Sequence, residues 1–82
     1  MKLEEQVKNI IEEQLHVKIR YDGEELFDMG CDGVDIIEIA NELEEKFEIK
    51  IKNEELSTEL TVRDVVRMVR RKVEKTNETQ TP

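Results

Sequence analysis

The sequence is poor in the residue types that mark secreted and membrane proteins. It holds 82 residues with a single cysteine, Cys31, so no internal disulfide can form and no oxidising compartment is needed. No apolar run approaches the ~20 residues that a membrane-spanning helix requires, and the first residues do not resemble a signal peptide. The sequence therefore predicts a cytoplasmic protein without membrane insertion.

The sequence also lacks groups of residues that do catalysis or bind metals. His16 is the only histidine, and we interpret it as a surface residue because a metal or general-base role needs companions that are absent. No nucleophile–base pair and no glycine-rich phosphate loop is present. A domain this small has a thin core and no room for a deep active site. We therefore expect no enzyme and no metal site, and a function carried by the surface.

Charge is abundant but unevenly placed. Residues 22–59 contain fourteen acidic and three basic residues, whereas residues 60–82 contain three acidic and six basic ones. The acidic middle should repel nucleic acid and anionic membranes and attract proteins with basic patches. The last segment carries a basic run of Arg63, Arg67, Arg70, Arg71 and Lys72. We interpret this run as a solvated face; an offset to the acidic middle and a partner contact are the alternatives.

Apolar residues recur at steps of three and four in three segments, which is the pattern of a helix with one buried face. The segments predict helices over about residues 2–15, over about residues 33–47, and from a cap at Thr61 onward. Residues 76–82 are polar and aperiodic, and they are predicted to form a flexible tail beyond a domain of residues 1–75. The residues predicted to face the core are Leu3, Val7, Ile10, Ile11, Leu15, Ile36, Ile39, Ala40, Leu43, Phe47, Val62, Val65, Val66, Val69 and Val73.

A long loop over about residues 18–31 separates the first two predicted helices. Its apolar residues are too many for a free linker and are predicted to pack on the core: Leu26, Phe27 and Met29. Gly30 is predicted to take a backbone conformation that a side chain would resist. Cys31 is interpreted as a small filler ahead of the helix.

The segment between the second and last helices is predicted to hold one short helical turn, at residues 54–57. Ile49 and Ile51 alternate with lysines, but this pair is too short for a strand without a partner. Asp32 is predicted to cap the second helix. The fold expected from the sequence is thus all-α: a small four-helix bundle with a long first loop and a short third helix.

Four segments, in order, resemble the acyl carrier protein family. Residues 28–35 read Asp-Met-Gly-Cys-Asp-Gly-Val-Asp, and residues 43–47 read Leu-Glu-Glu-Lys-Phe. The family signature runs roughly D-L-G-x-D-S-L-D, followed by an acidic helix that ends in L-E-x-x-F. Residues 4–17 and 60–66 look like the family's first helix and the start of its last.

The resemblance implies a four-helix carrier domain. In this family a transferase attaches 4′-phosphopantetheine to the signature serine, and the arm's thiol holds acyl intermediates for fatty acid, polyketide or lipid biosynthesis. The attachment point opens a helix, where free N–H groups and the helix dipole stabilise a phosphate. The carrier itself contributes no catalytic groups.

The sequence departs from the family pattern at this position. Gly33, between Asp32 and Val34, aligns with the attachment serine, and glycine has no hydroxyl to esterify. Ser57 lies outside the motif, and Cys31 is two residues too early. As it stands the chain should not accept the arm. Two explanations stay open: a replacement of the serine, or a natural chain that has lost carrying and kept binding.

The second predicted helix presents a candidate partner surface. One face carries acidic residues at i, i+3, i+7 and i+10, namely Asp35, Glu38, Glu42 and Glu45. Beside them lie Val34, Ile37 and Asn41, the last at a position where the family often has an apolar residue. A solvated acidic face is the alternative to docking, but the resemblance favours docking. It implies synthases, acyltransferases and phosphopantetheinyl transferase as the partners, and a monomeric chain. The competing function is a non-carrying module that binds carrier-recognising enzymes.

Overall fold

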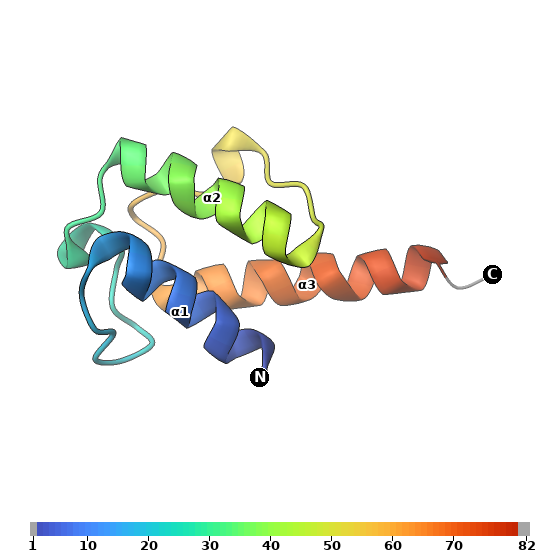
Figure 1. The fold of residues 1–82 in the computed structure, drawn as a ribbon, viewed down its shortest axis with the longest axis horizontal. Helices are drawn as coiled ribbons and strands as arrows, with labels where there is room; N and C mark the ends of the chain where they lie inside the picture. Colours follow the sequence, from blue (N-terminus) through green and yellow to red (C-terminus); the bar gives the residue numbers. More distant parts are fainter. Residues whose placement is uncertain (1, 81–82) are drawn as a thin grey trace.

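The fold is an arrangement of three α-helices, known from a computed structural model that describes residues 2–80. The elements are α1 (Leu3–Leu15), a 3₁₀ turn η1 (Phe27–Met29), α2 (Gly33–Phe47), a 3₁₀ turn η2 (Asn53–Glu55) and α3 (Val62–Gln80). Figure 1 shows α3 running past the ends of the other two helices. Among the described residues there is no strand, only an isolated antiparallel bridge between Glu25 and Thr61.

The predicted apolar faces of the three helices meet in one core. The helix bounds agree with the predictions to within a residue at both ends of α1 and α2 and at the start of α3. The side chains that are wholly or almost wholly buried are Val7, Ile11, Leu26, Ile39, Leu43, Val62, Val65 and Val69. Each contributes about 1.5–3 kcal/mol when it leaves water, so this core is what holds the helices together.

The long first loop is fastened to the segment just before α3 and to the first two residues of that helix. Four backbone hydrogen bonds join the two: Leu26 N to Leu60 O, Phe27 N to Thr58 O, Val62 N to Glu24 O and Arg63 N to Asp22 O. The buried carboxylate of Glu24 accepts the backbone N–H of Arg20 and pairs with its guanidinium at 3.4 Å. The loop is therefore part of the folded structure.

One loop residue does not pack as predicted. Leu26 and Met29 are buried, but Phe27 is 66% exposed. A 3₁₀ turn has three residues per turn, so positions three apart share a face and the position between them points elsewhere. The prediction for Phe27 was wrong because the apolar residues were counted without the period of the turn.

The predicted short third helix is a single 3₁₀ turn, shorter and earlier than residues 54–57. The Glu55 side chain accepts the Lys52 N–H at 2.8 Å, which closes the turn. Leu56 then has an extended backbone and a buried side chain. Because Leu56 must reach the core, the chain leaves the helical conformation after one turn.

Helices α1 and α2 end in the same way. Each is followed by a non-glycine residue with positive φ, whose N–H donates to the carbonyl four residues back. A glutamate in each last turn accepts the N–H seven residues ahead, Ile19 N to Glu12 Oε2 and Ile51 N to Glu44 Oε2, both at 2.8 Å. These bonds set the direction in which each loop departs.

Helix α3 is described as far as Gln80. Thr81 and Pro82, the last residues of the predicted tail, lie outside the described residues. The division into a domain over 1–75 and a tail over 76–82 stays a prediction.

Candidate functional site

The start of α2 is built by a turn and a reciprocal cap. Gly30 has a φ of +89°, in the left-handed region, which confirms the prediction of a backbone conformation that a side chain would resist. Asp32 caps the helix as predicted, since Asp35 N donates to Asp32 Oδ1 at 2.9 Å. The return bond, from Asp32 N to Asp35 Oδ2 at 3.2 Å, completes a capping box.

Gly33 opens α2 on the surface. A Cβ added to it would meet no atom within 4 Å, and the next residue, Val34, is 64% exposed. The N–H groups of Gly33 and Val34 have no recorded acceptor among the described residues. Free first-turn N–H groups and the helix dipole favour an anion at this point.

The same position lacks the atom that a phosphodiester link requires. There is space for a side chain at Gly33, but Gly33 has no hydroxyl. The nearest cysteine, Cys31, is 3% exposed and belongs to the core, as its interpretation as a filler predicted. Burial, with the nearby Asp35 and Asp32 carboxylates, raises the pKa of its thiol to about 11. Neither Gly33 nor the buried Cys31 therefore offers a group that could hold phosphopantetheine covalently at the start of α2.

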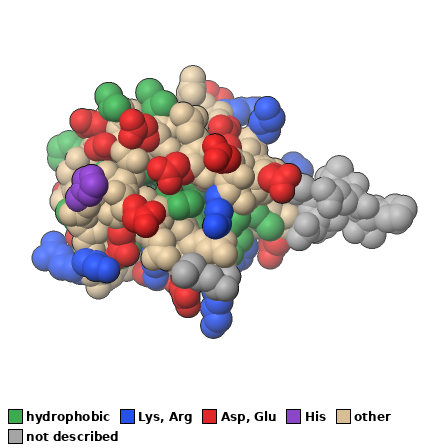
Figure 2. All heavy atoms as spheres, in the orientation of Figure 1, with side chains coloured by type: hydrophobic (Ala, Val, Ile, Leu, Met, Phe, Trp, Pro, Cys, Tyr) green, Lys and Arg blue, Asp and Glu red, His purple; other side chains and the backbone are tan. Residues whose placement is uncertain are grey.

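The predicted acidic stripe of α2 divides into two parts. Asp35 is half-buried and engaged in the cap, and the exposed Glu38 accepts a hydrogen bond from the Gln14 side-chain amide of α1. Glu42 and Glu45 are exposed and line a shallow groove between α1 and α2. Figure 2 shows acidic side chains spread over this face. The carboxylates most available to a partner are thus those of Glu42 and Glu45.

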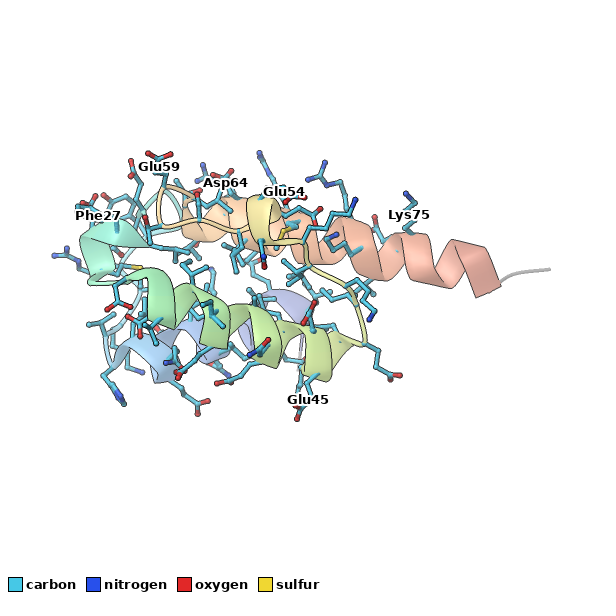
Figure 3. The ribbon with its side chains drawn as sticks, turned by 90° about the horizontal axis from the view of Figure 1, so that it is seen from above. Phe27, Glu45, Glu54, Glu59, Asp64 and Lys75 are labelled. Carbon is cyan, nitrogen blue, oxygen red and sulfur yellow. The ribbon has the colours of Figure 1, made fainter. Side chains whose placement is uncertain are left out.

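Exposed apolar residues lie at the beginning of the same helix. Val34 is 64% and Ile37 61% exposed, and these two residues are three positions apart on one helix, so they share one face. Phe27, which the sequence analysis assigned to the core, is labelled in Figure 3 at the end of the molecule where α2 begins. Asn41 is exposed farther along α2, where it adjoins a second shallow groove. The period of the 3₁₀ turn was the signal that could have identified Phe27.

Two further findings bear on the predicted absences. Among the side chains that the structure describes, those of residues 2–75, no three from His, Cys, Asp or Glu are grouped so that they could hold a metal ion. Over the same residues, no helix has the length and apolarity needed to cross a membrane.

Comparison with known proteins shows the family to which the chain belongs. The profile of the phosphopantetheine attachment site matches residues 5–69. The chain belongs to this family. Members of the phosphopantetheine attachment family carry 4′-phosphopantetheine.

Three relatives match most of this chain. The chain is 36% identical over 72 residues to an acyl carrier protein of Wolinella succinogenes, covering 84% of this chain and 95% of that protein. It is 33% identical over 72 residues to one of a Sulfurovum species, covering 84% and 96%. A third, of Campylobacter hominis, is 35% identical over 69 residues, covering 80% and 87%. These relatives are named as carriers rather than as catalysts.

Proposed function

We propose that this member of the phosphopantetheine attachment family is an acyl carrier-type protein that presents itself to biosynthetic enzymes through α2, in a form that cannot bear the arm. The observation that carries the proposal is the start of α2, where an exposed Gly33 stands with free N–H groups and open space around it. The glycine takes the position of the attachment serine in this proposal. The cargo of such a carrier is an acyl or related thioester intermediate.

Docking in this proposal uses the acidic and apolar residues of α2 together. Val34 and Ile37 supply apolar contact, while Glu42 and Glu45 supply negative charge beside the groove with α1. An enzyme with a basic patch around an apolar surface complements this arrangement. Asp35, Glu38 and Asn41 flank the contact. We propose synthases, acyltransferases and phosphopantetheinyl transferase as partners of a cytoplasmic monomer.

The proposal is tested by restoring the hydroxyl. The chain is incubated with coenzyme A and a broad-specificity phosphopantetheinyl transferase, and the intact mass is measured. The unchanged chain should keep its mass, whereas Gly33→Ser should gain the mass of the arm and then accept a thioester. Gly33→Ala is the matched control, because it alters the backbone in the same way without adding a hydroxyl. An arm on the unchanged chain or on Gly33→Ala contradicts the assignment of position 33.

The competing function is a module that binds carrier-recognising enzymes but no longer carries. The missing hydroxyl at Gly33 is the observation that favours it. If several transferases fail to modify Gly33→Ser while the chain still binds a carrier-recognising enzyme, the interaction module replaces the carrier. Rapid modification of Gly33→Ser favours a carrier whose only defect is the glycine.

Docking is tested by charge reversal on α2. Glu42→Lys with Glu45→Lys should weaken binding to a carrier-recognising transferase by about tenfold, and added salt should weaken binding of the unchanged chain in the same way. The control is Glu54→Lys with Glu59→Lys, two exposed residues on the other side of the molecule (Figure 3). Equal loss in both variants would mean that net charge, rather than the α2 face, governs binding.

A further inference from the structure

The outer face of α3 carries a row of arginines that the proposed function does not use. Arg63, Arg67 and Arg71 are four residues apart and are all exposed. They have no ion pair in the part of the chain that the structure describes. A fourth arginine, Arg70, is also exposed and only touches Glu4, at 4.0 Å. The arginine row is defined here as Arg63, Arg67 and Arg71.

The arginine row is unusual for its setting. The chain has a net charge of −8, and an unpaired cation would be expected to find a carboxylate within the molecule. The row instead stands opposite the buried side of α3, where Val65, Val69 and their neighbours face the core. The charges of Arg63 and Arg67 act on Asp64, and that of Arg63 on Asp22, as minor contributions that lower the pKa of both carboxyls. Because none of the three arginines pairs directly with a carboxylate of the described residues, their guanidinium groups stay available at the surface.

Helix α3, which carries the row, has its outward side on a different edge of the molecule from Glu45 of α2. In Figure 3, Asp64 and Lys75 mark the edge along which the side chains of α3 point outward, and Glu45 of α2 points to the other edge. A partner on the α3 face therefore leaves the α2 face uncovered.

We propose that the arginine row binds a helical protein segment rich in carboxylates while α2 remains free for a different partner. Residues four apart on a helix are separated by about 6 Å along its axis, so the row spans about 12 Å. Glutamates spaced by four on a partner helix repeat at the same distance. Each arginine fork can then meet a carboxylate in a two-point contact, which Lys could not form.

The geometry favours an acidic protein segment over other polyanions. The row covers only about two turns, and Asp64 and Glu74 border it on the same helix. A nucleic acid or an anionic membrane presents continuous negative charge, which would meet these carboxylates and the negative field of the whole chain. A single acidic helix can be placed so that it meets the arginines alone.

The probe for the test is a synthetic helical peptide of about four turns with glutamate at every fourth position. The control peptide has glutamine in place of each glutamate. The full chain, labelled with ¹⁵N, is titrated with each peptide, and the amide shifts are followed. The glutamate peptide should give saturable shifts centred on residues 63–71, and the glutamine peptide should give none. Shifts centred on another part of the chain, or the absence of saturable shifts, overturn the proposal.

Variants separate the row from overall charge. Replacing Arg63, Arg67 and Arg71 by alanine should weaken binding of the glutamate peptide at least fivefold and should keep the helices, because all three side chains are exposed. The amide spectrum shows whether the fold is kept. Equal binding by this triple variant overturns the proposal.

The matched control removes the same charge elsewhere. Lys2, Lys18 and Lys50 are exposed and lie off α3. Their replacement by alanine should change the binding of the glutamate peptide by less than twofold. A loss as large as that of the arginine variant would mean that the peptide responds to net charge alone.

Other occupants are tested directly. A DNA duplex, vesicles containing equal parts of anionic and zwitterionic phospholipid, and the unlabelled chain itself replace the peptide in the titration. Tighter binding of any of these at residues 63–71 than of the glutamate peptide overturns the choice of partner. None of the variants alters Gly33, so modification of Gly33→Ser by a transferase should proceed in the arginine variant as well. The proposed function and this inference can therefore fail separately.

Discussion

The starts of α2 and α3 have the same cap in different surroundings. Asp32 with Asp35 and Thr61 with Asp64 form reciprocal boxes of like geometry. At α3 the next two N–H groups donate to backbone carbonyls of the first loop, and Val62 is fully buried. At α2 the corresponding N–H groups have no recorded acceptor among the described residues, and Gly33 is exposed.

The difference shows how one local motif serves two purposes. A capping box satisfies part of a helix start and leaves the first N–H groups for something else. At α3 the first loop takes them, which ties that loop into the fold. At α2 they stay on the surface beside the position proposed for attachment. The surroundings, and not the cap, decide whether the first N–H groups of a helix are bonded within the fold or left at the surface.

The largest expected effect comes from loosening the loop that covers α3. Leu26 is fully buried, and its N–H donates to Leu60 O. Leu26→Ala should lower the free energy of unfolding by about 2–5 kcal/mol, because it leaves a cavity under the loop. Urea unfolding followed by circular dichroism measures this change. A loss below about 1 kcal/mol would show that the loop is not fastened through this side chain.

Removing the capping side chain at each helix start should show how much the starts of α2 and α3 each contribute to stability. Thr61 is half-buried and Asp32 is exposed, so water can replace the bonds of the latter more easily. We expect Thr61→Ala to cost about 1–2 kcal/mol of unfolding free energy and Asp32→Ala about 0.5–1 kcal/mol. The same urea experiment measures both. A larger loss for Asp32→Ala would reverse the assignment of the structural helix start.

Substitution of Gly30 and of Gly33, the two glycines near the start of α2, should change the free energy of unfolding in opposite directions. Neither has an atom within 4 Å of an added Cβ, but Gly30 has a φ of +89° and Gly33 does not have a positive φ. Gly30→Ala should cost about 1–2 kcal/mol because it forces a side chain into the left-handed region. Gly33→Ala should gain up to about 1 kcal/mol by restricting the unfolded chain. A stabilising Gly30→Ala would contradict the backbone described for this turn.

The smallest expected effect is a loss of stability at low pH that arises from Asp64. The Thr61 N–H and hydroxyl bonds hold the pKa of Asp64 below its usual 3.8. A lowered folded-state pKa adds stability that is complete above the unfolded pKa and is lost as the pH falls through the folded one. The difference in stability between the unchanged chain and Asp64→Asn should therefore be constant from pH 7 to about 5 and shrink below about 3.8. Thermal unfolding across this range measures it, and a difference that grows in acid would refute the sign.

The helices were predictable from sequence because their signals are local. The spacing of apolar residues gave the buried faces, and Asp32 and Thr61 gave two starts. The backbone bonds between the first loop and the segment before α3 were not predictable, since backbone groups carry no sequence signature. The glutamates that close α1 and α2, Glu12 and Glu44, look like any other acidic surface residue.

The candidate site was predictable in position but not in detail. Gly33 and the acidic stripe follow from the motif and the helical period. That Asp35 serves the cap and Glu38 contacts α1 depends on where neighbouring side chains lie in space. Phe27 was misplaced because its surroundings were read as a loop rather than as a 3₁₀ turn.

The reactivity of Cys31 reports the local opening of the structure around it. Its thiol is buried beside the start of α2, and its pKa is raised to about 11, so it reacts slowly with any reagent at neutral pH. Reaction must wait for a local opening that brings the sulfur to water. Because this is the only thiol, the rate at which a thiol reagent is consumed reports how readily this one region opens. A partner that holds the start of α2 in place slows the reaction.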